Sequence, residues 1–342
     1  MHAQEITQEL LALLQIASPT GRATPAADYC AERLAAFGLP VARTARGGVV
    51  ATVEGQSASP AQALTAHVDT LGAMVAEILA DGRLRLTPLG GLPALSCDGA
   101  YVEVLTRRGP VTGTILPKYA SAHVFGPRFE ELKRTWTEMR LRLDAKVEGP
   151  EDVAALGVAV GDYVVLDPRP VRTEAGYVKS RFLDDKASAA ALLLTAREAA
   201  KGPRPLRTTY LHFSVYEEVG QGAPAGIPEG VDELVAIDMA AVGDGQTSRE
   251  DLVTICAKDS GGPYDETVVR RLGAIAQAAG VPFVYDTYPY YSSDATAAAR
   301  TGRDVRIGLF GPGVDASHTH ERTHEDALLG TARLALAYIQ AS

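Results

Sequence analysis

The sequence predicts an α/β fold in which a mostly parallel sheet is covered by helices on both faces. Near-continuous apolar strands alternate with helices at both ends of the chain, which is typical of parallel strands buried on two faces. Between about residues 72 and 167, short alternating runs are separated by Gly and Pro turns, which is typical of antiparallel strands. We therefore predict one α/β domain, residues 1–71 and 168–342, with a small antiparallel β-barrel-like domain, residues 72–167, inserted into it.

The individual elements follow from the spacing of apolar residues and from turn signals. Ile6, Leu10 and Leu13 recur at helical intervals, and Gly38 is the expected end of a second helix. In the inserted domain we expect a short helix over 130–139 and a closing strand over 159–167. In the α/β domain we expect helices over 4–16, 24–37, 187–200, 267–279 and 327–340, and strands near 48–54, 62–67, 209–215, 234–238, 252–255 and 306–309.

Charge and cysteine content narrow the function classes. The chain has 342 residues and a net charge of −9, which argues against binding to nucleic acid or to an anionic membrane. Its three cysteines are far apart and form no CxxC pair, which argues against a disulfide framework and favours a reducing cytoplasm. We expect no signal peptide and no membrane span, because residues 1–15 are polar and charged and no apolar stretch approaches about 18 residues.

His67 and Asp69 are the first candidate site residues. They follow the apolar run Ala63–Ala66, so a buried strand delivers both polar side chains to its carboxyl end, on one side of the strand. A histidine whose second ring nitrogen is held by a carboxylate is the usual arrangement at a metal site. A core histidine beside a helix-capping aspartate is the alternative, and the pair alone does not decide between them.

Four further motifs place polar side chains at strand ends or in loops of the α/β domain. Three of them have a specific structural alternative: the aspartate pair could cap a helix, the glutamate pair could lie in a solvated loop, and the histidines could lie on the surface. Two adjacent glutamates at the end of a buried strand are nevertheless costly unless they are paired, protonated or bound to metal. The motifs are Asp184-Asp185, Glu217-Glu218, Asp238, and His318 with His320 and His324.

These motifs are expected to converge with His67, because ligands bind outside the carboxyl ends of parallel strands. Two histidines and three carboxylates around one doubly bridged position would form a dinuclear site for zinc, cobalt or manganese, since nitrogen and oxygen ligands suit these ions. One glutamate is left over beside the metals, and it would supply the general base of a hydrolytic site.

From about residue 10 to 338, the chain resembles the glutamyl/tetrahedral aminopeptidase family of dinuclear metallopeptidases, metallopeptidase family forty-two, some of whose members were once labelled cellulases. The matching stretches occur in order and at the family's spacing. The resemblance implies a zinc-aminopeptidase-like fold, dimerisation through residues 72–167, and twelve subunits in a hollow tetrahedron. The stretches are His67–Val75 with Pro88–Gly91, Leu156–Asp162, Asp184-Asp185, Glu217–Gly220 and Ser293–Ala295.

The resemblance also implies a ligand set for two divalent metal ions per subunit, zinc as the first expectation and cobalt or manganese as alternatives. Asp184 would bridge the two ions, and the peptide bond that follows it would be cis. His67 and Asp238 would complete one ion, and Glu218 and His318 would complete the other.

Further roles are implied for residues beside the metals. Glu217 would act as general base on a metal-bridging water, and Asp69 would orient His67. From its place just before Ser292-Ser293-Asp294, Tyr291 is predicted to bind the substrate together with Asp294, with core packing as the alternative for the tyrosine. These features predict an aminopeptidase that removes N-terminal residues from small peptides.

Two departures from the family pattern leave a second function open. Lys186 stands where the family usually has arginine, and lysine cannot copy arginine's bidentate contacts. The histidine-rich stretch that contains His318 also differs from the family pattern, so either His318 or His324 could be the last metal ligand. Both departures resemble a bacterial subgroup found with the synthesis of glutamine-dipeptide osmoprotectants. The alternative function is therefore a metal-dependent amidohydrolase or deacylase that acts on an N-acylated or amide-capped dipeptide.

Overall fold

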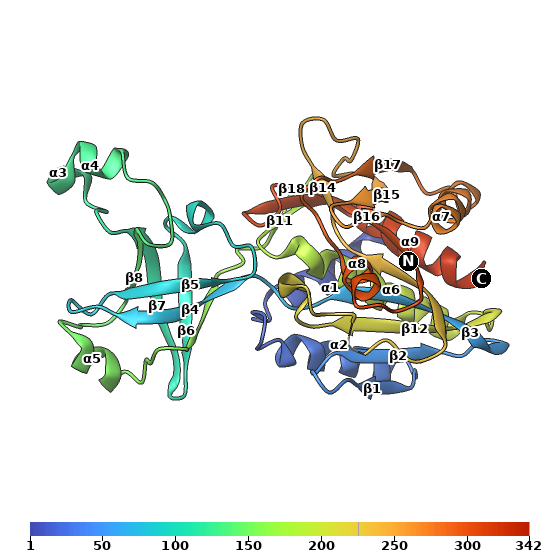
Figure 1. The fold of residues 1–342 in the computed structure, drawn as a ribbon, viewed down its shortest axis with the longest axis horizontal. Coiled ribbons are helices and arrows are strands. Elements are labelled where there is room, and N and C mark those ends of the chain that lie inside the picture. Colours follow the sequence, from blue (N-terminus) through green and yellow to red (C-terminus); the bar gives the residue numbers. More distant parts are fainter. Residues whose placement is uncertain (225, 342) are drawn as a thin grey trace. The chain divides into compact units, whose positions relative to one another are not determined.

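The computed structural model describes residues 1–224 and 226–341, and the chain forms two compact units (Figure 1). One unit consists of Met1–Thr70 with Arg169–Ser342, and the other consists of Leu71–Pro168. Each unit has its own buried core. None of the helices in the described part of the chain is long and apolar enough to span a membrane. The roles of catalysis and dimerisation that we assign to the two units stay predictions.

The first unit is built on a mixed sheet that has thirteen strands among the described residues. These are β1 Val41–Arg43, β2 Val49–Val53, β3 Ser57–His67, β10 Val171–Arg172, β11 Tyr177–Ser180, β12 Arg207–Ser214, β13 Val231–Ile237, β14 Ala240–Val242, β15 Val253–Asp259, β16 Gly262–Pro263, β17 Phe283–Thr287, β18 Arg306–Asp315 and β19 Glu321–His324. The main path runs β1-β2-β12-β3-β13-β18-β19-β11-β10. Its centre, β12-β3-β13-β18, is parallel, and β2 and β19 join it in antiparallel orientation.

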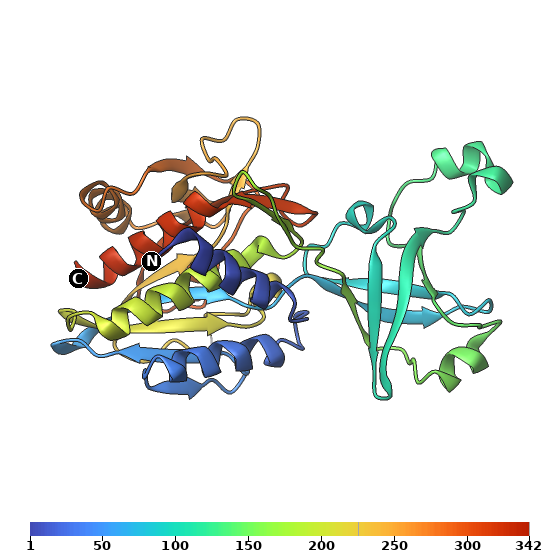
Figure 2. The ribbon, with the colours of Figure 1, turned by 180° about the vertical axis from the view of Figure 1, so that it is seen from behind.

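Helices cover both faces of this sheet (Figures 1 and 2). They are α1 Ala3–Leu14, α2 Thr24–Ala36, α6 Leu183–Lys201, α7 Glu266–Ala278, α8 Asp294–Arg300 and α9 Glu325–Gln340. α6 is rich in alanine and leucine, which are strong helix formers, and it is buried along most of its length against β3, α1 and α9. α8 covers the other face, where Ala295 and Ala298 join Ala61 and Ala63 of β3 in one core cluster. The predicted α/β fold is therefore confirmed.

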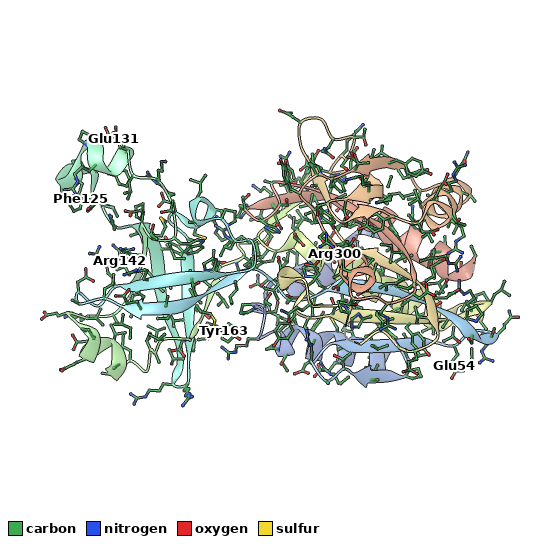
Figure 3. The ribbon with its side chains drawn as sticks, viewed as in Figure 1. Glu54, Phe125, Glu131, Arg142, Tyr163 and Arg300 are labelled. Carbon is green, nitrogen blue, oxygen red and sulfur yellow. The ribbon has the colours of Figure 1, made fainter. Side chains whose placement is uncertain are left out.

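The second unit is a closed antiparallel barrel with the strand order β4-β5-β8-β7-β6-β9. The strands are β4 Gly72–Ile78, β5 Leu84–Leu89, β6 Tyr101–Thr106, β7 Gly109–Pro117, β8 Met139–Leu143 and β9 Tyr163–Leu166. Alternate residues are buried, such as Val102 and Val104 of β6, whereas Tyr101 is exposed. Figure 3 shows Arg142 on β8 and Tyr163 on β9. The predicted barrel-like domain is also confirmed.

The predicted helix over residues 130–139 is wrong. The short helices of this unit are α3 Ala122–Phe125, α4 Pro127–Glu130 and α5 Pro150–Ala155, so α4 ends where the prediction begins. The segment that follows is held by its side chains. Arg134 donates to the carbonyls of Phe129 and Leu132, and Trp136 Nε1 donates to the carbonyl of Leu92. These contacts outweigh the local helix propensity.

Candidate metal centre

The parallel strands at the centre of the sheet position three of the predicted residues. His67 is the last residue of β3 and pairs in register with Ser214, the last residue of β12, so Glu217 follows three residues later. β13 also runs parallel to β3 and ends at Ile237, so Asp238 follows directly. Because the carboxyl ends of these strands are neighbours, the three side chains meet at one edge of the sheet.

Asp184 and His318 come from two other segments. Asp184 lies in the first turn of α6, and the predicted cis peptide bond after it is confirmed. His318 lies in the loop between β18 and β19. β19 pairs with β11, the strand that leads into α6, so this pairing brings the two segments together.

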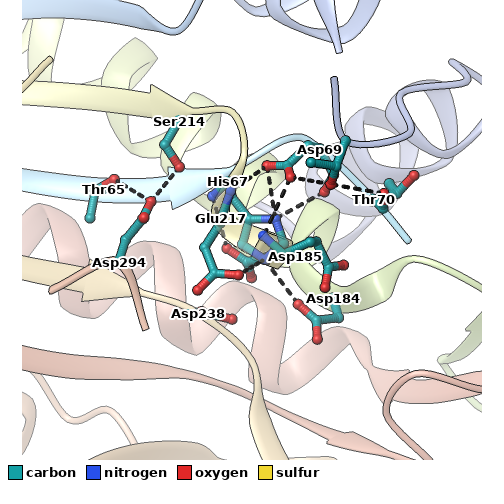
Figure 4. A network of polar contacts seen from close by, with 12 residues as sticks. Thr65, His67, Asp69, Thr70, Asp184, Asp185, Ser214, Glu217, Asp238 and Asp294 are labelled. Atoms are coloured by element: carbon teal, nitrogen blue, oxygen red, sulfur yellow. Dashed lines mark hydrogen bonds and ion pairs between the residues drawn. The ribbon is translucent and has the colours of Figure 1, made fainter. Parts of the chain in front are cut away.

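His67, Asp184 and Asp238 form one group of potential ligands (Figure 4). Nε2 of His67 lies 3.0 Å from Oδ1 of Asp184. Each of the three residues offers one ligand atom, and these atoms lie within 4.8 Å of one another. All three residues are buried. Oε2 of Glu217 lies 3.8 Å from His67 Nε2, so the predicted base stands beside this group.

A second group forms around the other carboxylate oxygen of Asp184. Nε2 of His318 lies 3.4 Å from Asp184 Oδ2 and 3.9 Å from Glu218 Oε2. Oε1 of Glu218 is buried and has no hydrogen-bond partner among the described residues. The two oxygens of Asp184 therefore face two different histidines, each with a further carboxylate nearby.

The side chain of Asp69 mainly contacts the turn that carries the two glutamates. Its carboxylate accepts hydrogen bonds from the backbone N–H groups of Glu217, at 3.1 Å, and Glu218, at 3.4 Å, and from the hydroxyl of Thr20, at 2.7 Å. Nδ1 of His67 lies 2.9 Å from the backbone carbonyl of Asp69 but 3.6 Å from its carboxylate. The ring of His67 is thus oriented by the Asp69 backbone, while the carboxylate holds the 3₁₀ turn Glu217–Val219.

The side chain of Asp294 and the hydroxyl of Tyr291, the two predicted substrate-binding groups, are both buried. The Asp294 carboxylate accepts hydrogen bonds from the hydroxyl of Ser214 and from the backbone N–H of Ala223, the latter at 2.6 Å. The Tyr291 hydroxyl lies beside Asp238. Burial raises the pKa of the Asp238 carboxyl to about 7, whereas the Tyr291 hydroxyl favours a lower pKa. Contact of either residue with a substrate stays a prediction.

His324 belongs to neither group. It caps α9, where Nδ1 accepts a hydrogen bond of 3.1 Å from the backbone N–H of Asp326. Its Nε2 lies 2.8 Å from the carbonyl of Ala175, and its ring packs edge-on against Tyr177 with centroids 4.9 Å apart. Both ring nitrogens are committed elsewhere, which favours His318 over His324 as the candidate ligand.

Crowded carboxylates dominate the electrostatics of the centre. Burial raises the pKa of Glu217 well above its usual value, and the charge of Asp238 adds to this effect. Burial likewise raises the pKa of Glu218, with a further contribution from Asp184. Burial alone would lower the pKa of His67, but its hydrogen bond to Asp184 and the charge of Glu217 raise it well above the usual value. Carboxylates this close together stay charged only beside compensating positive charge.

The residues present fit divalent metal ions. Histidine nitrogens and carboxylate oxygens are the ligands that zinc, cobalt and manganese accept. Buried charges are costly unless they are paired or coordinate a metal. A cation beside Glu218 would supply the partner that Oε1 of this residue lacks among the described residues. The structure thus contains a possible metal site, and the identity and number of the ions stay predictions.

Two residues that contact the candidate ligands or their neighbours were not predicted from the sequence. Thr20 donates to Asp69 from a turn whose Ser-Pro-Thr-Gly pattern indicates only a bend. Glu321 contacts the backbone of Asp184 and His318. Its only sequence signal is its place inside the histidine-rich stretch, three residues after His318.

Comparison with known proteins identifies the family that the chain matches. The model of the family described as M42 glutamyl aminopeptidase matches residues 47–334. The chain is 43% identical over 337 residues to a putative aminopeptidase, YhfE, of Bacillus subtilis (strain 168), an alignment that covers 98% of this chain and 97% of that protein.

Solved structures show the same fold. An aminopeptidase from the archaeon Desulfurococcus kamchatkensis superposes with a TM-score of 0.87 at 23% identity, covering 99% of this chain and 96% of that one. The TET1 peptidase of Pyrococcus horikoshii, which can assemble into a tetrahedron or a large octahedral shell, superposes with a TM-score of 0.87 at 20% identity, covering 98% and 99%.

The fold, the cluster of histidines and carboxylates, and the relatives define the chain as a peptide hydrolase. It belongs to the M42 glutamyl aminopeptidase family. The predicted family and enzyme class are therefore confirmed.

Proposed function

We propose that this chain is an aminopeptidase that uses two divalent metal ions, zinc as the first candidate, and Glu217 as its general base. The observation that carries the proposal is the position of Asp184. One of its oxygens lies 3.0 Å from the ring of His67, and the other lies 3.4 Å from the ring of His318. A buried carboxylate with one histidine on each side suits a ligand shared by two ions, because carboxylate and imidazole are ligands that these ions accept.

The ligands follow from the two groups of side chains. Asp184 would be shared, His67 and Asp238 would hold one ion, and Glu218 and His318 would hold the other. When bound, the ions lower the pKa of water and polarise the scissile carbonyl as Lewis acids.

Glu217 is placed to move the proton in this reaction. Its carboxylate lies at the edge of the first group, 3.8 Å from His67 Nε2, and the Asp69 carboxylate fixes its backbone N–H. In the proposed reaction, the Glu217 carboxylate takes a proton from the attacking water and gives it to the leaving amine nitrogen.

The proposed substrates are small peptides with a free amino terminus, with Tyr291 and Asp294 beside the bound substrate. The similarity to the TET1 peptidase supports a homo-oligomer. We propose that the unit Leu71–Pro168 forms dimers and that these assemble into a cytoplasmic dodecamer.

The test of the mechanism compares Glu217→Gln with Glu229→Gln. Glu229 is an exposed glutamate that, like Glu217, lies between β12 and β13. Both variants replace a glutamate by glutamine, so the chemical change is the same. We expect Glu217→Gln to lower kcat by about 10²–10⁴-fold, the usual worth of a general base, while metal analysis shows unchanged metal content. Glu229→Gln should keep normal turnover. Near-normal turnover of metal-loaded Glu217→Gln would refute the assignment.

The substrate class is tested with a panel of compounds, each with and without chelator. Chelator-sensitive release from aminoacyl anilides with a free amine would support the aminopeptidase. Cleavage confined to N-acetylated dipeptide amides would instead support the amidohydrolase.

A further inference from the structure

Glu321 lies outside the residues assigned to catalysis and metal binding, yet its side chain contacts two of their segments. Its Oε2 accepts a hydrogen bond of 3.1 Å from the backbone N–H of Asp184, and its Oε1 accepts one of 2.9 Å from the backbone N–H of His318. Glu321 is only 1% exposed. One buried carboxylate therefore joins the two segments that deliver Asp184 and His318.

Strand pairing places Glu321 where it can reach both segments. Glu321 is the first residue of β19 and pairs in register with Ser180, the last residue of β11. The chain enters α6 three residues after Ser180, and the loop that carries His318 ends directly before Glu321. The side chain thus stands at the junction of the two segments.

Both segments contain strained backbone that needs such support. Phe182, two residues before Asp184, has φ 67°, and Ala316 and His318 have φ 58° and 64° in the other segment. Residues with a Cβ atom rarely adopt this left-handed conformation, and they keep it only where their surroundings fix it. The two hydrogen bonds of Glu321 provide a fixed point for each strained segment.

We propose that Glu321 is a positioning residue that sets the separation between Asp184 and His318 and thereby the affinity of the centre for its second metal ion. The inference rests on the proposed function, because it requires both residues to be metal ligands. A carboxylate suits this role since both of its oxygens accept hydrogen bonds, whereas a glutamine side chain has one acceptor oxygen and an NH₂ group that only donates. In Glu321→Gln, the NH₂ group would face a backbone N–H and leave that donor unpaired in the protein interior.

The test measures metal binding by the full chain carrying Glu321→Gln, with Glu325→Gln as the matched control. Glu325 lies four residues later and pairs with Arg172, whose side chain is 41% exposed. The metal-free proteins are titrated with Zn²⁺ and with Co²⁺ against a chelator of known affinity, and the visible absorption of Co²⁺ reports its coordination. In Glu321→Gln we expect the affinity for one of two ions to fall about 10–100-fold, the usual loss when a residue that orients a ligand is changed. Glu325→Gln should bind both ions as the wild type does.

A second variant, Glu321→Asp, keeps the carboxyl group but is one methylene too short to reach both N–H groups, so it should show the same selective loss. A wild-type protein that binds no metal would overturn the proposed function itself. Wild-type binding of two ions, together with unchanged affinities and Co²⁺ spectra in both folded variants, would overturn the positioning role alone. A loss of thermal stability without a loss of affinity would also overturn it, because it would show a purely structural brace.

Discussion

His212 is a buried histidine that lies outside the candidate metal centre. It lies in β12, is 1% exposed, and its Nδ1 is 3.1 Å from the hydroxyl of Thr65. Burial, followed by the charge of Arg303, lowers the pKa of His212 from 6.5 to about 4. The folded chain therefore keeps this ring neutral at pH values where the unfolded chain protonates it.

We expect this difference to make the protein less stable in mild acid. Between pH 6.5 and about 4, unfolding takes up a proton at His212, so the free energy of unfolding falls as the pH falls through this range. A shift of this size corresponds to a loss of about 3 kcal/mol at its limit. Urea unfolding of metal-free protein should show a steeper decline for the wild type than for His212→Gln. Parallel pH profiles of the two proteins would contradict the expectation.

For individual residues, sequence patterns predict the place of a side chain in a strand but not its contacts with distant segments. The apolar run Ala63–Ala66 is enough to predict that His67 ends a buried strand, and alternation places His67 and Asp69 on one side of it. It could not predict that the Asp69 carboxylate binds the backbone of Glu217 and Glu218, because that contact depends on how a distant turn folds. The histidine-rich stretch left His318 and His324 open for the same reason, since only the pairing of β19 with its neighbours separates them.

At the scale of elements, a buried carboxylate ties two helices to the start of a strand. Glu233 of β13 is 0% exposed and accepts hydrogen bonds from Arg271 of α7 and from the hydroxyl of Tyr338 of α9. Arg306, at the start of β18, lies 3.5 Å away. This network lies at the amino end of the parallel strands, and the candidate metal centre lies at the carboxyl end.

Removing Arg271 should therefore destabilise the α/β unit. In Arg271→Met the buried Glu233 loses its closest cation. Because Arg271 is 31% exposed and Arg306 and Tyr338 stay beside Glu233, we expect a cost of about 2 kcal/mol, less than breaking a fully buried pair. The adjacent Arg270 is the matched control, because its pair with Glu266 is 79% and 77% exposed. Arg270→Met should cost at most about 1 kcal/mol. Chemical denaturation measures both variants, and equal losses would argue against a structural role for the network.

The elements themselves were largely predictable. The central strands were recognisable because strands buried on both faces are apolar, and their carboxyl ends then identified the edge of the sheet that carries the candidate site. Two segments differ from the structure that their sequence predicts. The segment 130–139 has helical composition, but Arg134 and Trp136 bind carbonyls outside any helix. β18 extends to Asp315 through Gly311, Pro312 and Gly313, residues that normally indicate a turn.

At the scale of the whole molecule, the two units have separate cores, and only one of them carries the candidate centre. We therefore expect chelation to lower the melting temperature of the α/β unit and to leave that of the barrel unchanged. The reason is mass action: an ion that binds only folded protein stabilises the unit that binds it.

The chain offers a built-in reporter for this prediction. Its one tryptophan, Trp136, lies in the barrel unit, where its ring nitrogen donates to the carbonyl of Leu92. Tryptophan fluorescence then reports the barrel, while circular dichroism is dominated by the helices of the other unit. A chelator-induced shift of the fluorescence transition that equals the shift in circular dichroism would show that the two units melt together.

The change of texture near residues 72 and 167 reflects a change from apolar to alternating strands, and the two compact units divide close to these positions. The assembly of subunits could not be predicted from the sequence, since nothing in composition or spacing distinguishes a face that contacts a second subunit. The expectation of dimers and of a dodecamer depends on the resemblance to known aminopeptidases alone.

The spread of the candidate ligands along the chain has a kinetic consequence. His67, Asp184, Glu218, Asp238 and His318 come together only when strands from both halves of the sequence have paired. Contacts between distant segments form late, because closing long loops costs entropy before any contact repays it. An ion held by these residues would then bind after the folding barrier, so it would slow unfolding and leave the folding rate nearly unchanged. The bound ion would in this way increase the kinetic stability of the folded α/β unit.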